Sequence, residues 1–207
     1  MPSGDQHGVT LSPCPLVRLR QPLPSTPITA IGATTGTPNV GWVLHAGALT
    51  PATATATYQW KSSPATGGPY ANIAGAITNT YTPVTGDVGK YIKVAATGTG
   101  IYTGTVTSEA VGPVRIPLTA IGATTGTPNV DSVLTAGALT PVGAIATYQW
   151  ISAPAASGPY TIITGAITNT YTPIAGDVGK YIKVKAHGSG IYTGLVISEA
   201  VGPVTAG

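Results

Sequence analysis

The sequence predicts an all-β protein in which two tandem β-sandwich domains follow an extended, proline-rich amino-terminal arm. The first observation is an internal repeat, because the nine residues GDVGKYIKV occur at Gly86–Val94 and again at Gly176–Val184. The repeat extends to Pro27–Pro113 and Pro117–Pro203, which differ at 21 of 87 aligned positions. The second observation is composition: 28 Gly, 19 Pro and only 7% charged residues suit strands and turns better than helices.

The arm is assigned to residues 1–26, ahead of a first domain at 27–114 and a second domain at 115–207. Five prolines in the arm fix φ and remove backbone donors, so neither a helix nor a central strand is expected there. Within it the sequence LVRLR alternates apolar and basic residues, the period of a strand with one solvent-exposed face. We expect this segment to dock on a neighbouring molecule, or alternatively to fold back along its own first domain. The candidate docking residues are Leu16, Val17, Arg18, Leu19 and Arg20.

Each domain is predicted to contain about seven short strands. Turn sequences such as TTGTPN, SSPATGGP, TPVTGD and TGTGIYTG separate them at the spacing of a sandwich. A short segment with two prolines, Val111–Pro117, predicts a semi-rigid linker between the domains. In the first copy the expected strands are Ile28–Ala33, Val40–Ala46, Thr55–Lys61, Tyr70–Ile73, Thr78–Thr82, Lys90–Ala96 and Thr105–Glu109.

Two kinds of residue are expected to hold each sandwich together. A large indole ring in the third strand can fill the space between two sheets about 10 Å apart, which makes Trp60 and Trp150 predicted core residues. At the turn before the sixth strand, a carboxylate can accept backbone N–H groups and a glycine can adopt positive φ. The residues predicted for this corner are Asp87, Gly89 and Tyr91, with Asp177, Gly179 and Tyr181 in the second copy.

The motifs TYQW, NTYTP, GDVGKYIKV and SEAVGPV resemble the immunoglobulin-like repeats of bacterial surface proteins and tailed-bacteriophage virion proteins. The resemblance covers both repeats and implies two immunoglobulin-like sandwiches, in which Tyr91 and Tyr181 correspond to the tyrosine corner. Two departures stand out. Lys93 and Lys183 occupy the position of a half-disulfide, so packing has to replace that tie. The apolar alternation runs through Ile92 rather than the tyrosine, which predicts either a bulge or a tyrosine at the sheet margin.

The residues offer little for catalysis or for metal, cofactor or nucleic-acid binding. Of six carboxylates, four repeat between the copies, and the corner or cross-strand pairing with Lys90 or Lys93 explains them. Three scattered histidines and one cysteine, Cys14, provide neither a zinc ligand set nor a nucleophile–base pair. The net charge of +3 is not clustered into a basic face, no apolar run is long enough to span a membrane, and the amino terminus lacks a signal-peptide pattern. We therefore expect a non-enzymatic protein without cofactors, not exported by the signal-peptide route.

Surface aromatic residues are the remaining candidates for partner contacts. Positions with very different residues in the two copies are unlikely to be core, as where Trp42 aligns with Ser132 or Lys61 with Ile151. We expect Trp42 to be at least partly exposed and to contact a partner, the neighbouring domain or the arm. Tyr102 and Tyr192, in the predicted turn before the last strand, either stack on sugars or protein or close the end of the sandwich.

These expectations combine into a structural display protein. The leading hypothesis is an exterior bacteriophage virion protein, such as a head decoration, which the arm anchors to other virion proteins while the domains project outward and aid adhesion. The first alternative is a bacterial cell-surface or filament subunit that assembles as a homo-oligomer by strand addition of the arm. A second alternative is a carbohydrate-binding module that recognises host-surface glycans.

Overall fold

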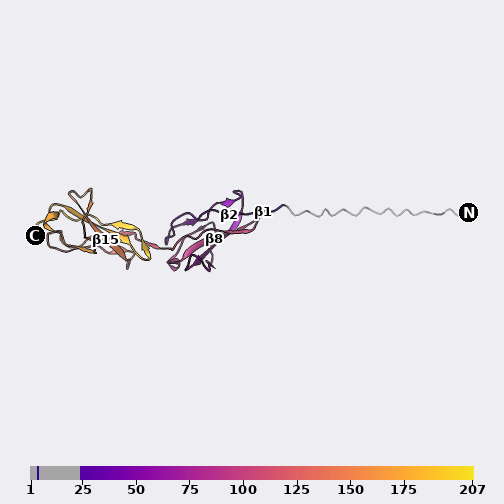
Figure 1. The fold of residues 1–207 in the computed structure, drawn as a ribbon, viewed down its shortest axis with the longest axis horizontal. Helices are drawn as coiled ribbons and strands as arrows, with labels where there is room; N and C mark the ends of the chain where they lie inside the picture. The colour runs from indigo at the N-terminus through magenta and orange to yellow at the C-terminus, as the bar shows by residue number, and fades with distance from the viewer. Residues whose placement is uncertain (1–3, 5–23) are drawn as a thin grey trace.

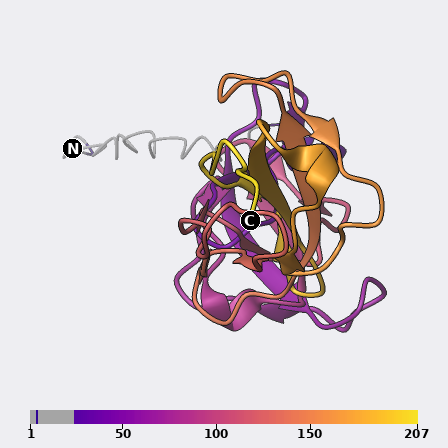
Figure 2. The same cartoon turned by 90° about the vertical axis from the view of Figure 1, so that its left-hand side faces the viewer.

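A computed structural model describes residue 4 and residues 24–207, and these residues form an all-β structure. Two β-sandwiches follow one another along the long axis of the molecule (Figure 1). The first sandwich comprises residues 24–115 and the second sandwich comprises residues 116–207. Strand β1 lies at the end of the first sandwich away from the second, and the carboxyl terminus lies at the opposite end of the molecule (Figure 1). Viewed along the long axis, the second sandwich stands in front of the first (Figure 2).

The first sandwich contains ten short strands and one turn of 3-10 helix. They are β1 (Thr26–Pro27), β2 (Ala30–Ile31), β3 (Leu44–His45), β4 (Leu49–Thr50), β5 (Ala56–Ser63), β6 (Ala71–Asn72), β7 (Thr80–Tyr81), η1 (Thr85–Asp87), β8 (Tyr91–Gly98), β9 (Tyr102–Thr103) and β10 (Thr105–Thr107).

Every element of the first sandwich recurs in the second sandwich, ninety residues further along the chain. Its elements are β11 (Ile116–Pro117), β12 (Ala120–Ile121), β13 (Leu134–Thr135), β14 (Leu139–Thr140), β15 (Ala146–Ala153), β16 (Thr161–Ile162), β17 (Thr170–Tyr171), η2 (Ala175–Asp177), β18 (Tyr181–Gly188), β19 (Tyr192–Thr193) and β20 (Leu195–Ile197).

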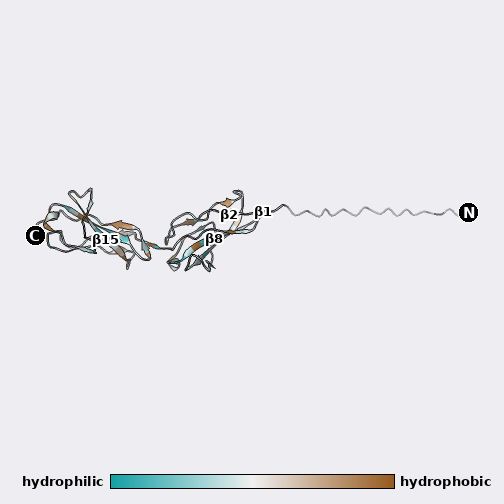
Figure 3. Ribbon diagram, in the orientation of Figure 1, coloured by the Kyte–Doolittle hydropathy of each residue, from teal (hydrophilic) through white to brown (hydrophobic). Residues whose placement is uncertain are grey.

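The strand order is immunoglobulin-like. One layer is the four-stranded sheet β10-β8-β5-β6, which corresponds to strands G, F, C and C′ of that fold. The pairs β2-β4 and β3-β7 form the other layer. In this layer β2 corresponds to strand A, β3 and β4 together to strand B, and β7 to strand E. Hydrophobic residues occur in short stretches interrupted by polar ones along both sandwiches (Figure 3), as expected for strands with one buried face.

The core of each sandwich is built around one tryptophan. Trp60 is fully buried among Leu44, Ile92, Val94 and Val114. Trp150 is equally buried within the same set of neighbours in the second sandwich. The alternation of Ile92 and Val94 toward this core has the parity that the sequence predicts. Strands β5 and β8 pair without interruption from Ala56 to Ser63, so the predicted bulge is wrong, and Tyr91 begins β8 at the margin of the sheet.

A close approach of two strands explains one of the glycines in this layer. A Cβ atom on Gly47 would collide with the carbonyl group of Gly32 on the facing strand. Gly137 and Gly122 repeat the contact in the second sandwich. The sequence-based strand that ended at Ala46 corresponds to β3, and Gly47 lies between it and β4.

Two assignments made from sequence need correction. Thr26, assigned to the arm, lies in β1, where it pairs in parallel with Tyr102. Tyr102 and Thr103, assigned to a turn, form the partner strand β9. Parallel pairs of two residues carry no hydrophobic period, because only the backbone of a distant segment completes them.

The two sandwiches join without a spacer residue. Arg115, which the sequence-based boundary placed in the second domain, donates its N–H to Pro38 O and accepts the N–H of Val40 in the first sandwich. The next residue, Ile116, donates its N–H to Ile191 O in the second sandwich. The segment predicted to be a linker is therefore the last strand of one sandwich followed directly by the first strand of the next.

Candidate functional site

A buried carboxylate organises the corner before β8, and a tyrosine outside the predicted set of corner residues binds it. Asp87, which is 4% exposed, accepts the Tyr81 hydroxyl at 2.5 Å and the Val84 N–H at 3.0 Å through one oxygen. Burial, then the hydrogen bond and charge of Asp87, raises the pKa of Tyr81 above its usual value. Tyr81 in β7 is therefore a further residue of this corner, which the sequence analysis did not select, and Tyr91 begins β8 as predicted.

The second sandwich repeats this corner. The Tyr171 hydroxyl lies 2.5 Å and the Ile174 N–H 3.1 Å from the same oxygen of Asp177, and the pKa of Tyr171 is raised for the same reasons. Tyr181 begins β18 as Tyr91 begins β8. The corner glycines Gly89 and Gly179 have φ of +81° and +82°, a conformation that residues with a side chain rarely adopt.

The tryptophans also serve as hydrogen-bond donors. The indole Nε1–H of Trp60 donates to Thr78 O at 2.9 Å, and Trp150 donates to Thr168 O at the same distance. The Trp60 ring lies 5.7 Å from the Tyr81 ring between centroids. Core indole and corner carboxylate are therefore linked through one tyrosine.

Charged side chains among the described residues make few contacts with one another. No group of three His, Cys, Asp or Glu within this part of the chain is placed to hold a metal ion. The lysine pairing expected from sequence is limited: Lys180 Nζ lies 3.7 Å from Asp177 Oδ1, the one ion pair found in residues 24–207. Lys93 and Lys183 instead lie over the rings of Tyr70 and Tyr160, at 5.0 and 5.1 Å.

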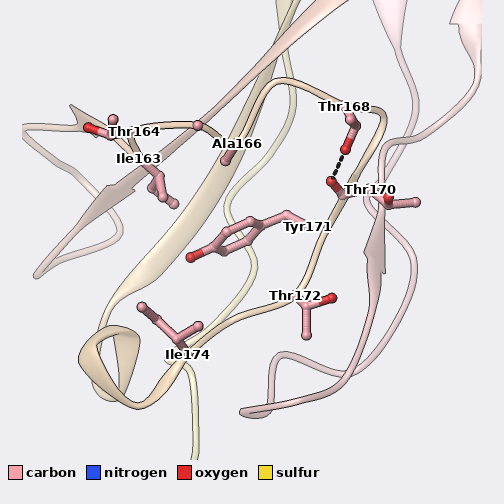
Figure 4. Close-up of a pocket in the computed structure, with 9 residues that line it drawn as sticks. Ile163, Thr164, Ala166, Thr168, Thr170, Tyr171, Thr172 and Ile174 are labelled. Atoms are coloured by element: carbon pink, nitrogen blue, oxygen red, sulfur yellow. Dashed lines mark hydrogen bonds between the residues drawn. The ribbon is translucent and has the colours of Figure 1, made fainter.

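A shallow groove lies beside the corner in each sandwich. In the second sandwich it has a volume of about 480 Å³, and Tyr171 lies across its centre (Figure 4). Thr168, Thr170 and Thr172 follow one side along β17, and Ile163 and Ile174 lie on the other (Figure 4). The first sandwich has the equivalent groove along β7, of about 400 Å³. These grooves are not apparent from sequence, because a missing neighbouring strand creates them.

The outer face of the four-stranded sheet differs strongly between the two sandwiches. Residues opposite one another across the strands share a face, and of eleven outward positions on β10, β8, β5 and β6, seven differ between the copies. Of the ten inward positions on the same strands, only one differs between the copies, where Ala71 corresponds to Thr161. The outward differences are Lys61 to Ile151, Ser63 to Ala153, Asn72 to Ile162, Ala95 to Lys185, Thr97 to His187, Thr105 to Leu195 and Thr107 to Ile197.

This divergence makes the second sandwich more apolar on its outer face. Ile162, Leu195 and Ile197 are 65%, 53% and 47% exposed. The rule that differing positions lie outside the core fails at Ile151, which is 3% exposed between Ile162 and Lys183 on neighbouring strands. The sequence rule therefore overestimates exposure at Ile151, the position of Lys61 in the first sandwich.

The aromatic residues selected from sequence lie in different surroundings. Trp42 is 50% exposed in the turn before β3. Tyr102 is half-buried in β9, and its hydroxyl donates to Thr53 Oγ1 at 2.8 Å. Tyr192 packs against Leu118 at the corresponding end of the second sandwich. Tyr102 and Tyr192 lie in equivalent strands of different sandwiches, and the arm residues Leu16–Arg20 lie outside the described residues.

Solved structures to which this chain is similar include three that share little sequence with it. No protein-family model and no curated protein sequence matches the chain. A crystal structure of murine CEACAM1b is 16% identical over 86% of this chain and 98% of that chain, with a TM-score of 0.43. A crystal structure of the chicken interferon gamma receptor alpha chain is 8% identical over 83% of this chain and 94% of that chain, with a TM-score of 0.42. The FN1–FN3 domains of chicken CNTN1 are 12% identical over 86% and 67%, with a TM-score of 0.31.

The strand order and the duplicated core define the class of protein as a tandem immunoglobulin-like β-sandwich. Folds of this class are used as binding and display modules, and their function depends on the surface rather than the fold. In residue 4 and residues 24–207, no helix is long and apolar enough to cross a membrane.

Proposed function

We propose that this chain is a non-enzymatic display protein on the exterior of a bacteriophage virion. Residues 1–23 attach to other virion proteins, and the two sandwiches project from the particle. The main observation in favour of this proposal is that β1 and the carboxyl terminus lie at opposite ends of the molecule (Figure 1). Because the sandwiches join without a spacer, a chain held at its amino-terminal end holds its second sandwich away from that attachment.

The divergence of the outer sheet face supports the same function. The inward face of the four-stranded sheet is nearly identical in both copies, whereas the outward face of the second sandwich has gained exposed Leu195 and Ile197. A distal face with its own apolar surface suits contact with a host or neighbouring particle component.

Immunogold labelling of purified virions tests this proposal. An antibody against the second sandwich is expected to label intact particles, and removal of residues 1–23 is expected to abolish labelling while the circular dichroism of the protein is unchanged. A chain with Leu195→Thr and Ile197→Thr serves as the matched control, because it carries the residues of the first sandwich and keeps the arm. Full-length protein that is found free of particles, as a monomer by native mass spectrometry, would contradict the proposal.

A bacterial cell-surface or filament subunit is the second candidate. It is favoured by a free strand edge in each sandwich, along which the grooves lie. In this form the arm adds a strand to a neighbouring copy, and deletion of residues 1–23 is expected to abolish polymerisation seen by electron microscopy. Filaments that persist after the deletion would rule out this form.

Recognition of host glycans is the third candidate, and the exposed ring of Trp42 favours it. Trp42→Ala is expected to abolish binding on a glycan array. Tyr102→Ala and Tyr192→Ala are expected to act mainly on stability, because both tyrosines pack into the end of a sandwich. An array without any signal for the unaltered chain would exclude this candidate.

A further inference from the structure

The groove of the second sandwich follows the free edge of a strand. Strand β17 pairs with β13 alone. Thr135 in β13 uses both of its backbone groups on Thr125. Since backbone groups along a strand alternate in direction, those of Thr170, opposite Thr135, face away from β13. The N–H groups of Thr170 and Thr172 therefore point into the groove, with no backbone acceptor among the described residues.

The groove lies where a further strand of this layer would lie. Immunoglobulin-like domains with a D strand place it beside E, which is the side of β17 that is open here. The opposite layer is the four-stranded sheet β16-β15-β18-β20, whereas the layer that contains β17 has only the pairs β12-β14 and β13-β17 among the described strands. Tyr171 forms the floor, and Ile163 and Ile174 line the groove beside it, with Ile174 61% exposed. An extended segment with apolar residues on one face would pair with the backbone of β17 and cover this apolar surface.

The arm contains a segment with this pattern. In LVRLR, Val17 and Leu19 fall on one face of a strand and Arg18 and Arg20 on the other. We propose that residues Leu16–Arg20 of one copy add as a strand to the free edge of β17 in a second copy. Val17 and Leu19 then lie over Tyr171 and between the isoleucines, and both arginines face solvent. This inference rests on the strand-addition form of the proposed function and names its receiving site.

The positions of the two ends favour a second copy over the same chain. Residue 24 leads into β1 at the end of the first sandwich away from the second (Figure 1). The receiving groove lies near the carboxyl terminus: Pro173 O accepts the N–H of Asp131, and the adjacent Val130 O lies beside Gly207. Such a contact joins different surfaces of the two copies, so its repetition builds rings or open chains unless two antiparallel copies exchange arms.

Disulfide trapping tests the inference in the full-length protein, because Cys14 is the only cysteine and lies two residues before the segment. With Thr172→Cys, mild oxidation is expected to give a ladder of covalent dimers, trimers and larger species on a non-reducing gel. Thr147→Cys is the matched control, since Thr147 is an exposed threonine on the outer face of β15, and it is expected to stay monomeric. Adding Val17→Asp and Leu19→Asp is expected to remove the ladder, whereas Leu16→Asp, on the solvent face, is expected to retain it.

Three outcomes would overturn the inference. They are no crosslink in the Thr172→Cys variant, an equal ladder from the Thr147→Cys control, or a monomer with an internal disulfide, which would place the arm on its own chain. The result is independent of the virion assay. If removal of residues 1–23 abolishes virion labelling while the Thr172→Cys variant forms no crosslink, the virion proposal stands and the receiving groove is wrong.

Discussion

Replacing Tyr81 by phenylalanine separates the hydrogen bond of the corner from the packing of the ring. The change leaves the ring beside Trp60 but removes the hydroxyl donor from the buried carboxylate of Asp87. A hydrogen bond to a charged group contributes about 1.5–3 kcal/mol. We therefore expect the first sandwich to lose about 2 kcal/mol of stability, or roughly 10 °C in Tm for a domain of this size.

The second sandwich supplies the internal control. Tyr171→Phe removes the same donor, but Lys180 lies 3.7 Å from Asp177 Oδ1 and remains. Because the lysine side chain is 42% exposed, it offsets only about 0.2–1 kcal/mol. The second sandwich is thus expected to lose somewhat less stability than the first, and Lys180→Met combined with Tyr171→Phe is expected to remove the difference.

Domain-resolved unfolding is the appropriate assay, because two sandwiches need not unfold in one transition. The indole N–H signals of Trp60 and Trp150 in NMR spectra report one sandwich each during urea titration, since each indole is bonded within its own core. Tyr81→Phe should shift the midpoint for Trp60 and leave that for Trp150 nearly unchanged. If the Trp60 midpoint does not move, or moves less than that of Trp150 in the Tyr171→Phe variant, the corner hydrogen bond does not stabilise the fold as described.

Three further predictions concern the same cores. Folding raises the pKa of Tyr81 and Tyr171. Their contribution to the free energy of unfolding is therefore complete below about pH 10 and declines as the pH rises through their pKa values in the folded protein. Replacing both with phenylalanine should reduce the loss of Tm that the unaltered chain shows above that pH. Trp60→Ala is expected to cost about 3–5 kcal/mol in the first sandwich alone; thermal unfolding in one unchanged transition would refute this. Gly47→Ala should cost about 1–3 kcal/mol through the collision with the facing strand, whereas Gly86→Ala, where a Cβ meets no atom within 4 Å, should be nearly neutral in the same melts.

The long strands and their core could be predicted from the sequence. Strands β5 and β8 carry an apolar alternation toward Trp60 and Ile92, and the ninety-residue repeat doubles the signal. The all-β class follows from the abundance of glycine and proline between such segments. Periodicity and repetition are properties of neighbouring residues, so a single chain reveals them.

Other features depend on residues that are distant in sequence. The pairing of β1 with β9 and the assignment of the corner hydroxyl to Tyr81 follow from backbone paths that no local pattern specifies. The groove follows an edge of β17 that no strand within residues 24–207 pairs with, and an unpaired edge cannot be recognised from the residues of the strand itself. Trp42 could be selected because the second copy has serine at its position, and this comparison needs no structure.

The direct junction between Arg115 and Ile116 determines how the molecule responds to tension. Each sandwich begins with a strand that runs parallel to its neighbour, and each ends with parallel bridges, such as Val88 to Val114 and Val178 to Val204. A pull on the two ends slides these strands lengthwise, so several hydrogen bonds must break together rather than one after another. Because no unpaired residue lies between the sandwiches that could extend first, a pulling force is transmitted directly from the parallel hydrogen bonds of one sandwich to those of the next. The chain therefore has the properties of a mechanical tether.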